Sequence, residues 1–250
     1  MDGNQYEAIF LNYFRGIFPN ADNLNVKCVK RMSEQQMKTT ISRHGMRCTV
    51  LNGKDKISSY TVKKIVETPG KREYYGVRDI FAFKLLDMMG VGPKVHFVSN
   101  GEVGDDVGLF IVTEDEPEFD TSRPRKIRSM ERFFLYLLSI PNTRYGADGN
   151  GRFVIHDFVI STSPQSSYAP NFMRLHSHGV ERSRKTGRQC FERWAINKMI
   201  DDADMAIGQE KALIDGDIEL NNDNDYWTYV SLVRENVKIL YDTIHSNSKK

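Results

Sequence analysis

The stretch of sequence that decides the fold is Gly151-Arg-Phe-Val-Ile-His-Asp157-Phe158. Its apolar residues predict a short buried strand, and the glycine-rich run 146–151 before it predicts a turn. The strand ends in an acidic residue followed by an aromatic one. That combination is typical both of a core strand with an acidic end and of a strand that presents a carboxylate to a ligand. The order of the elements around it distinguishes the two readings.

Upstream of this stretch, β-type patterns surround one helical pattern. Residues 37–67 are rich in β-branched and alternating residues, with breaks at His44-Gly45 and Asn52-Gly53 that are typical of hairpin turns. Apolar residues then recur at intervals of three and four until Gly90, Gly92 and Pro93 end the pattern. We predict strands over 38–43, 46–51 and 57–67, a helix over 73–89, and strands over 94–99 and 109–114. The predicted order is therefore β-β-β-α-β-β.

Helical patterns occupy both ends of the chain. Aromatic residues at helical spacing over 6–17 predict an amphipathic helix, whose stripe we expect to pack on its own domain rather than bind a partner. After a connector at 115–125 we predict helices over 127–140, 188–214 and 225–244, and residues 153–158 form the strand described above. The predicted organisation is a helical extension over 1–29, a β-rich small lobe over 30–116 and a helical large lobe over 117–250. The predicted fold class is α+β.

Composition bounds the function. The 250 residues, 40% of them hydrophobic, can bury a core, and the net charge of +2 is too balanced to make nucleic acid the expected partner. The start is acidic and polar, and no run of about 18 apolar residues is present, so we expect neither a signal peptide nor a membrane span. Cys28, Cys48 and Cys190 show no paired spacing. We predict reduced thiols in a cytoplasmic or nuclear protein that is not secreted.

The element order, together with Tyr60-Thr-Val-Lys63-Lys64-Ile65 and the Asp157-Phe158 strand, resembles the protein-kinase-like superfamily. The resemblance covers about residues 38–158 and implies a two-lobed kinase-like fold, with a five-stranded small lobe containing one helix and a short helical large lobe. It implies that Lys63, or Lys64 in the alternative register, contacts ATP phosphates, and that Asp79 orients this lysine. Glu114 would lie where backbone amides meet adenine, and Asp157 would bind Mg²⁺.

Two stretches depart from that family. The loop between the first two predicted strands has only Gly45 where a glycine-rich phosphate loop is expected. The family also has a catalytic aspartate followed about five residues later by a metal-binding asparagine, whereas this chain has Ile140-Pro-Asn142-Thr-Arg144-Tyr-Gly146. Arg144 falls at the asparagine position, and a cation there would repel Mg²⁺. Asn142 and Asp148 are the candidates to position an acceptor.

These departures lead to a functional prediction. The chain is expected to be a pseudokinase-like regulatory or scaffolding protein that acts through contacts with a protein partner and binds ATP and Mg²⁺ weakly or not at all. The first alternative is an active atypical kinase that depends on ATP and Mg²⁺. The second is a nucleic-acid-binding module that uses the basic runs at 123–128 and 182–188.

Overall fold

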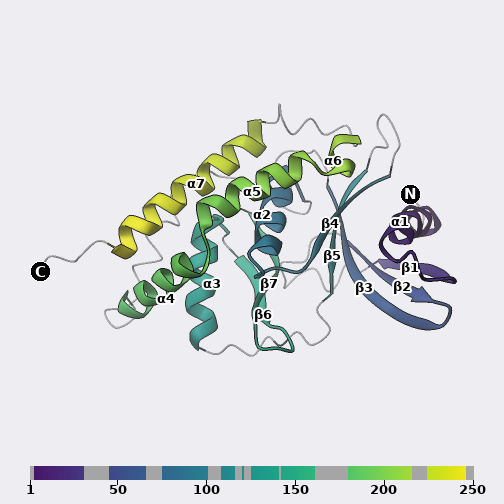
Figure 1. The fold of residues 1–250 in the computed structure, drawn as a ribbon, viewed down its shortest axis with the longest axis horizontal. Coiled ribbons are helices and arrows are strands. Elements are labelled where there is room, and N and C mark those ends of the chain that lie inside the picture. The colour runs from purple at the N-terminus through teal and green to yellow at the C-terminus, as the bar shows by residue number, and fades with distance from the viewer. Residues whose placement is uncertain are drawn as a thin grey trace, which may run out of the picture. The chain divides into compact units, whose positions relative to one another are not determined.

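Alternating and β-branched residues form an antiparallel sheet in the order β1-β2-β3-β5-β4, which Figure 1 shows beside α1. The strands are β1 (Leu24–Lys30), β2 (Met46–Asn52), β3 (Asp55–Lys64), β4 (Val95–Ser99) and β5 (Leu109–Glu114). Gly53 joins β2 to β3 with a φ of 61°, as the Asn-Gly turn predicts. The predicted strands at 46–51, 94–99 and 109–114 are thus confirmed within a residue, and β3 covers most of 57–67.

The computed structural model describes residues 3–30, 45–65, 75–100, 108–115, 120, 125–140, 142–160, 180–215 and 224–245. By its contacts the chain divides into two compact units. The first unit comprises Met1–Val77, Pro93–Glu116 and Gly208–Leu220, and the second comprises Arg78–Gly92, Pro117–Ile207 and Asn221–Lys250. Both units are therefore built from segments that are distant in sequence.

Helix α1 (Gly3–Ile17) covers one face of the sheet. Phe10 and Phe14 are fully buried in a cluster that also contains residues of all five sheet strands, namely Val26, Cys48, Val50, Tyr60, Val62, Val98, Phe110 and Val112. The ring of Phe14 lies 4.4 Å from that of Tyr60, and the ring of Phe10 lies 5.4 Å from that of Phe110. The expectation that the aromatic stripe packs on its own domain is confirmed.

The prediction of a helical extension over residues 1–29 needs correction at its end. Residues 24–29 fall within the predicted extension and Lys30 within the predicted small lobe, but residues 24–30 together form the edge strand β1 and pair with β2 along their whole length. The apolar side chains of Leu24, Val26 and Cys28 alternate with polar ones, which is a strand period. The strand predicted over 38–43 lies outside the described residues.

The prediction of reduced thiols is also wrong for two of the cysteines. Cys28 lies opposite Cys48 in the β1–β2 register, with a Cα–Cα distance of 4.2 Å, and the two form a disulfide. Pairing across a ladder depends on register rather than on sequence spacing, so the spacing of the cysteines did not reveal it. Cys190 is a free, buried thiol, and burial raises its pKa to about 12. The disulfide removes the cysteine-based argument for an intracellular protein.

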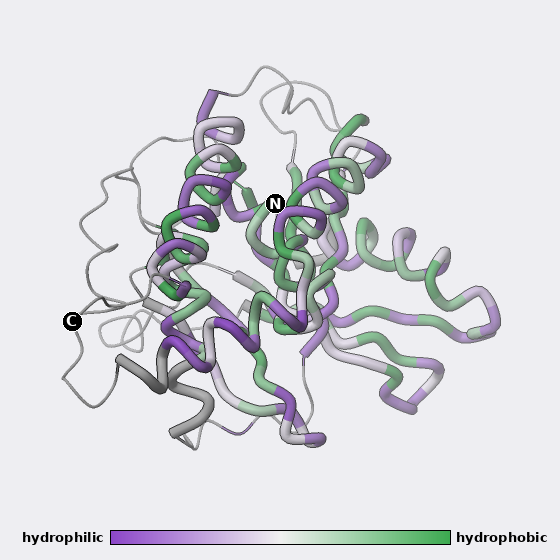
Figure 2. The backbone as a smooth tube through the Cα atoms, turned by 60° about the vertical axis from the view of Figure 1, so that its left-hand side comes forward, coloured by the Kyte–Doolittle hydropathy of each residue, from purple (hydrophilic) through white to green (hydrophobic). Residues whose placement is uncertain are grey.

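The second unit is mainly helical. Its elements are α2 (Val77–Met88), α3 (Arg125–Leu137), the hairpin β6 (Asn142–Ala147) and β7 (Phe153–Val159), α4 (Val180–Arg193), α5 (Ile196–Gly208) and α7 (Asn224–His245). The short α6 (Lys211–Asp215) belongs to the first unit and contacts β4. Helices α3, α4 and α7 pack on one another, and α3 also contacts the hairpin. Figure 2 shows bands of hydrophobic and hydrophilic residues along the helices, as expected when each helix buries one side.

The α+β class is confirmed, with a five-stranded antiparallel sheet, a two-stranded sheet and one helix between β3 and β4 in the described residues. Strand β6 was not predicted, because its sequence Asn-Thr-Arg-Tyr-Gly-Ala reads as a loop. Among the helices that the structure describes, none is long and apolar enough to cross a membrane.

Candidate functional site

The sheet face opposite α1 carries several polar residues among apolar ones, and one of the polar residues is the predicted phosphate-binding lysine. Successive strand residues point to opposite faces of a sheet. The Lys63 side chain therefore points away from the face of the buried Val62 and lies on the same face as Thr61 and Thr113. Lys63 is 1% exposed, and its Nζ donates a hydrogen bond to Thr113 Oγ1 at 2.6 Å. The Tyr75 ring lies 5.9 Å from the same Nζ. The alternative residue, Lys64, is half-buried, and by the strand alternation it lies on the face that α1 covers.

A second polar group on this face joins three strand segments. Arg47 Nε forms an ion pair with Asp115 Oδ2 at 2.9 Å, and Thr61 Oγ1 donates to Asp115 Oδ1 at 2.8 Å. Asp115 follows β5 directly and is the residue after Glu114, where the resemblance implies adenine recognition. The side chain of Asp115 is 14% exposed and that of Arg47 is 53% exposed. These contacts tie β2 and β3 to the residue that follows β5.

Sequence reasoning missed the Arg47–Asp115 pair. The only signal available was an acidic residue at the end of a strand. Identifying its partner required the β2–β3 register, which places Arg47 opposite Thr61.

The backbone amides at the end of β5 are already used within the first unit. The Glu114 amide donates to the Lys94 carbonyl at 3.0 Å, and the Asp115 amide donates to the Ser59 carbonyl at 2.8 Å. The Glu114 side chain accepts a hydrogen bond from Ser58 Oγ at 2.8 Å. Glu114 is thus the last residue of β5 and its amide is hydrogen-bonded within the first unit, while its predicted role at adenine stays a prediction.

Asp79 lies in the first turn of α2 and is 4% exposed. An acidic residue there is favourable to the helix dipole. Burial, and next the negative charge of Asp79, raise the pKa of Tyr229 on α7 well above its ordinary value, while Arg78 acts in the opposite direction. Arg78 in turn forms an ion pair with Asp225 at 3.0 Å. Asp79 belongs to the second unit and Lys63 to the first, so their pairing stays a prediction.

Asp157 occupies the predicted place near the end of β7 and is 7% exposed. Its Oδ1 accepts a hydrogen bond from the Phe158 amide at 2.9 Å, and its carbonyl accepts one from Thr143 Oγ1 at 2.9 Å. Arg144 stands directly opposite Asp157 in the hairpin register. Phe158 is fully buried, and its ring lies 4.4 Å from that of Phe83 on α2. The Asp157 carboxylate is therefore hydrogen-bonded to the next backbone amide, and its residue is paired with Arg144 on the other strand of the hairpin.

The two candidate acceptor-positioning residues lie at opposite ends of β6. Asn142 begins the strand opposite Val159, close in register to Asp157. Asp148 follows the other end of the strand, where Ala147 pairs with Phe153. Asp157 lies four residue steps beyond Phe153, which is about 13 Å along the hairpin. The structure therefore places only Asn142 at the same end of the hairpin as Asp157.

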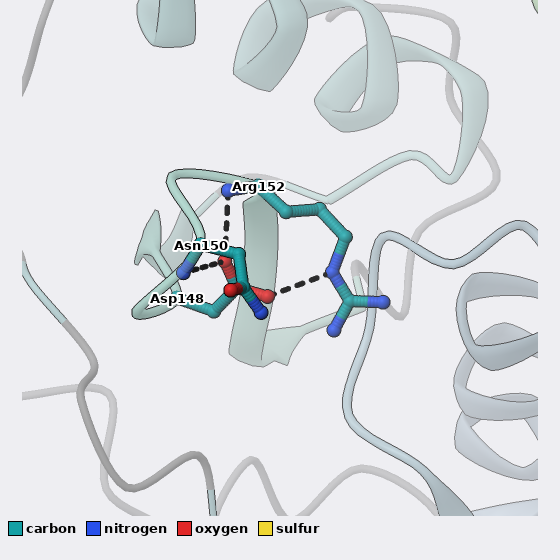
Figure 3. A network of polar contacts seen from close by, with 3 residues as sticks. All are labelled: Asp148, Asn150 and Arg152. Atoms are coloured by element: carbon teal, nitrogen blue, oxygen red, sulfur yellow. Dashed lines mark hydrogen bonds and ion pairs between the residues drawn. The ribbon is translucent and has the colours of Figure 1, made fainter.

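Asp148 organises the β6–β7 turn, as Figure 3 shows. One carboxylate oxygen accepts hydrogen bonds from the Asn150 amide at 3.0 Å and the Arg152 amide at 2.8 Å, and the other pairs with Arg152 Nε at 2.9 Å. Burial alone would raise the pKa of this carboxyl, but the backbone and side-chain hydrogen bonds from Arg152, with that of Asn150, hold it below its ordinary value. A carboxylate used in this way is a turn residue and a weak base.

The connection between α3 and β6 is short, and α7 is hydrogen-bonded to the end of α3 and to the first residue of the connection. Helix α3 ends at Leu137 and β6 begins at Asn142, with only residues 138–141 between them. From α7, Asn236 Nδ2 donates to the Tyr136 and Leu137 carbonyls at 3.1 Å, and the Tyr229 hydroxyl donates to the Leu138 carbonyl at 2.8 Å. Four residues cannot contain both an aspartate and an asparagine about five residues later, which is the pattern that the resemblance requires.

No three or more histidine, cysteine, aspartate or glutamate side chains gather as a metal site in the part of the chain that the structure describes. Mg²⁺ would therefore have Asp157 as its one predicted protein ligand, opposite Arg144. Mg²⁺ can be held by one or two carboxylates together with substrate phosphates, but a neighbouring guanidinium weakens such a site.

Comparisons with models of known protein families, with curated proteins and with solved structures found no match.

Proposed function

We propose that this chain is a pseudokinase-like regulatory or scaffolding protein with a two-lobed kinase-like fold. The proposal is supported by the β-β-β-α-β-β order, by the buried Lys63 on β3 and by Asp157 on β7. In this scheme residues 30–116 form the small lobe and residues 117–250 form the large lobe. Function then depends on contacts with a protein partner, and nucleotide binding is weak.

The observation that carries this proposal is the direct passage from α3 to β6. Phosphoryl transfer requires a group that orients the nucleophile in addition to phosphate and metal contacts. The four residues 138–141 leave no room for the usual loop, and Asp148 is committed to its turn. An active atypical kinase would have to use Asn142, whose amide cannot accept a proton as a base.

The test combines nucleotide-induced stabilisation with an assay for phosphate release or transfer. If ATP binds with a dissociation constant of about 1 mM, a concentration of about 5 mM stabilises the protein by about 1 kcal/mol. For a chain of this size that raises the melting temperature by roughly 2–4 °C. We expect this small rise with little dependence on Mg²⁺, together with turnover at the background level.

Matched variants locate the effect. Lys63→Met keeps the volume of the buried side chain and removes its charge, so we expect it to abolish the shift, whereas Lys64→Met should retain it. Asp157→Asn should change the shift little if Mg²⁺ contributes little. A large Mg²⁺-dependent shift with ATP turnover that disappears in Asp157→Asn would refute the pseudokinase proposal in favour of the active kinase.

A further inference from the structure

The Cys28–Cys48 disulfide joins the outermost strand of the sheet to its neighbour. Cys48 is fully buried in the cluster beneath α1, whereas Cys28 on the edge strand is only partly buried. The bond closes a segment of the chain with a sequence separation of 20. It therefore restrains β1 independently of the ladder hydrogen bonds.

Helix α1 is connected to this edge. Glu7 Oε1 on α1 accepts a hydrogen bond from the Cys28 amide at 2.9 Å. Phe10 and Phe14 of α1 are packed in the same cluster as Val26 and Cys48. Opening of β1 would therefore remove part of the surface on which α1 packs.

We propose that Cys28 and Cys48 are a thiol–disulfide exchange site that controls how firmly α1 and β1 are held on the sheet. Disulfides in cytoplasmic or nuclear proteins are uncommon and usually transient or redox-sensing. Exchange requires that a small thiol such as glutathione reaches one sulfur, and Cys28 on the edge strand is only partly buried. A reducing glutathione pool therefore opens the pair, and an oxidised pool lets it form again. The inference does not depend on the proposed kinase-like function.

The unequal burial of the two cysteines sets the order of the exchange. A glutathione thiolate attacks Sγ of Cys28, the sulfur–sulfur bond breaks, and Cys48 leaves as a thiolate that takes up a proton. A second glutathione thiolate attacks the mixed disulfide and releases the Cys28 thiol and oxidised glutathione. Two glutathione thiols thus supply the two electrons, and oxidised glutathione reverses the sequence. Because an apolar environment disfavours the Cys48 thiolate, reduction requires opening of the edge.

Amide hydrogen exchange of the full chain, oxidised with glutathione disulfide or reduced with a phosphine, tests the proposal. Closing a loop of this length changes the opening equilibrium by on the order of 100-fold or more. We expect amides of α1 and β1 to exchange faster by about that factor after reduction, while amides of α7 stay unchanged. Equal exchange of α1 and β1 in the two states would overturn the proposal.

Variants separate the bond from other effects of the reagents. Cys28→Ser should exchange at the reduced wild-type rate whether or not the phosphine is present, and Cys48→Ala should behave in the same way. Cys190→Ala, which leaves the pair intact, should retain the redox response. Mass spectrometry should find the trapped glutathione adduct on Cys28, and an adduct on Cys48 instead would refute the proposed order.

Discussion

Substitution of Gly92 by alanine is the sharpest test of how the structure places the Asp157 strand. Gly92 follows the end of α2, where the Val91 and Gly92 amides both donate to the Leu86 carbonyl at 3.0 Å. The Val91 carbonyl accepts a hydrogen bond from the Ile155 amide of β7 at 2.7 Å. The end of α2 is therefore attached to the strand that carries Asp157.

A β-carbon at Gly92 has no space. It would lie 2.8 Å from Cβ and 3.1 Å from the carbonyl carbon of Leu86, and the second of these is a backbone atom that cannot rotate away. Overpacking of this kind costs about 1–3 kcal/mol. For a chain of this size each kcal/mol lowers the melting temperature by roughly 2–4 °C. Gly92→Ala should therefore melt several degrees lower than the wild type.

The assay is thermal and urea unfolding, with hydrogen exchange at the Ile155 amide as a local measure. Gly16→Ala is the matched control, because Gly16 lies in α1 with no atom within 4 Å of an added β-carbon. That change should stabilise the protein by about 0.5–1 kcal/mol, since glycine is unfavourable in a helix. If Gly92→Ala unfolds at the wild-type midpoint with Ile155 still protected, the described junction between α2 and β7 is wrong.

Two further predictions concern the β6–β7 hairpin. Phe158→Ala removes a fully buried ring that lies 4.4 Å from the ring of Phe83, so urea unfolding should show a loss of about 3–5 kcal/mol, and a loss below about 1 kcal/mol would contradict this packing. Asp148→Asn should cost about 1–2 kcal/mol at neutral pH by weakening the contacts with Arg152. Because the pKa of Asp148 is lower folded than unfolded, this contribution is present above its ordinary pKa of 3.8 and is lost as the pH falls through the folded value. The unfolding free energies of Asp148→Asn and the wild type should converge in acid, and a constant difference down to about pH 2 would refute the assignment.

Much of the sheet could be predicted because its signals are local. The run Leu109–Glu114 is bounded by turn residues and forms β5 over the predicted range. The Asn52-Gly53 pair also specifies its turn by backbone preference alone, because glycine adopts a positive φ without strain. Strand β6 lacks such a signal and owes its conformation to pairing with β7. Tertiary pairing has overridden local propensity there.

The contacts that define the candidate site could not be predicted in the same way. The Arg47–Asp115 ion pair and the Cys28–Cys48 bond each join residues that are distant in sequence and become neighbours only when a register is fixed. The sequence placed Lys63 on a strand and Asp157 near a strand end. Only the structure shows that Thr113 binds the lysine and that Asp148 is occupied by its own turn.

The two proposals act on opposite faces of one sheet, and this makes them separable. Cys48 and Tyr60 are paired on the face that α1 covers, whereas Lys63 points to the other face with Thr113. Nucleotide binding and disulfide formation share no contact residue in this arrangement, so their stabilising effects should add to within about 0.5 kcal/mol. The measurement is the ATP-induced shift of oxidised and reduced protein, with Cys28→Ser as a control that cannot form the bond. Equal ATP-induced shifts in the oxidised and reduced protein would show that nucleotide binding and the disulfide stabilise the protein independently. A shift that appears only in the oxidised protein would show that the restraint on β1 affects nucleotide binding on the face that carries Lys63.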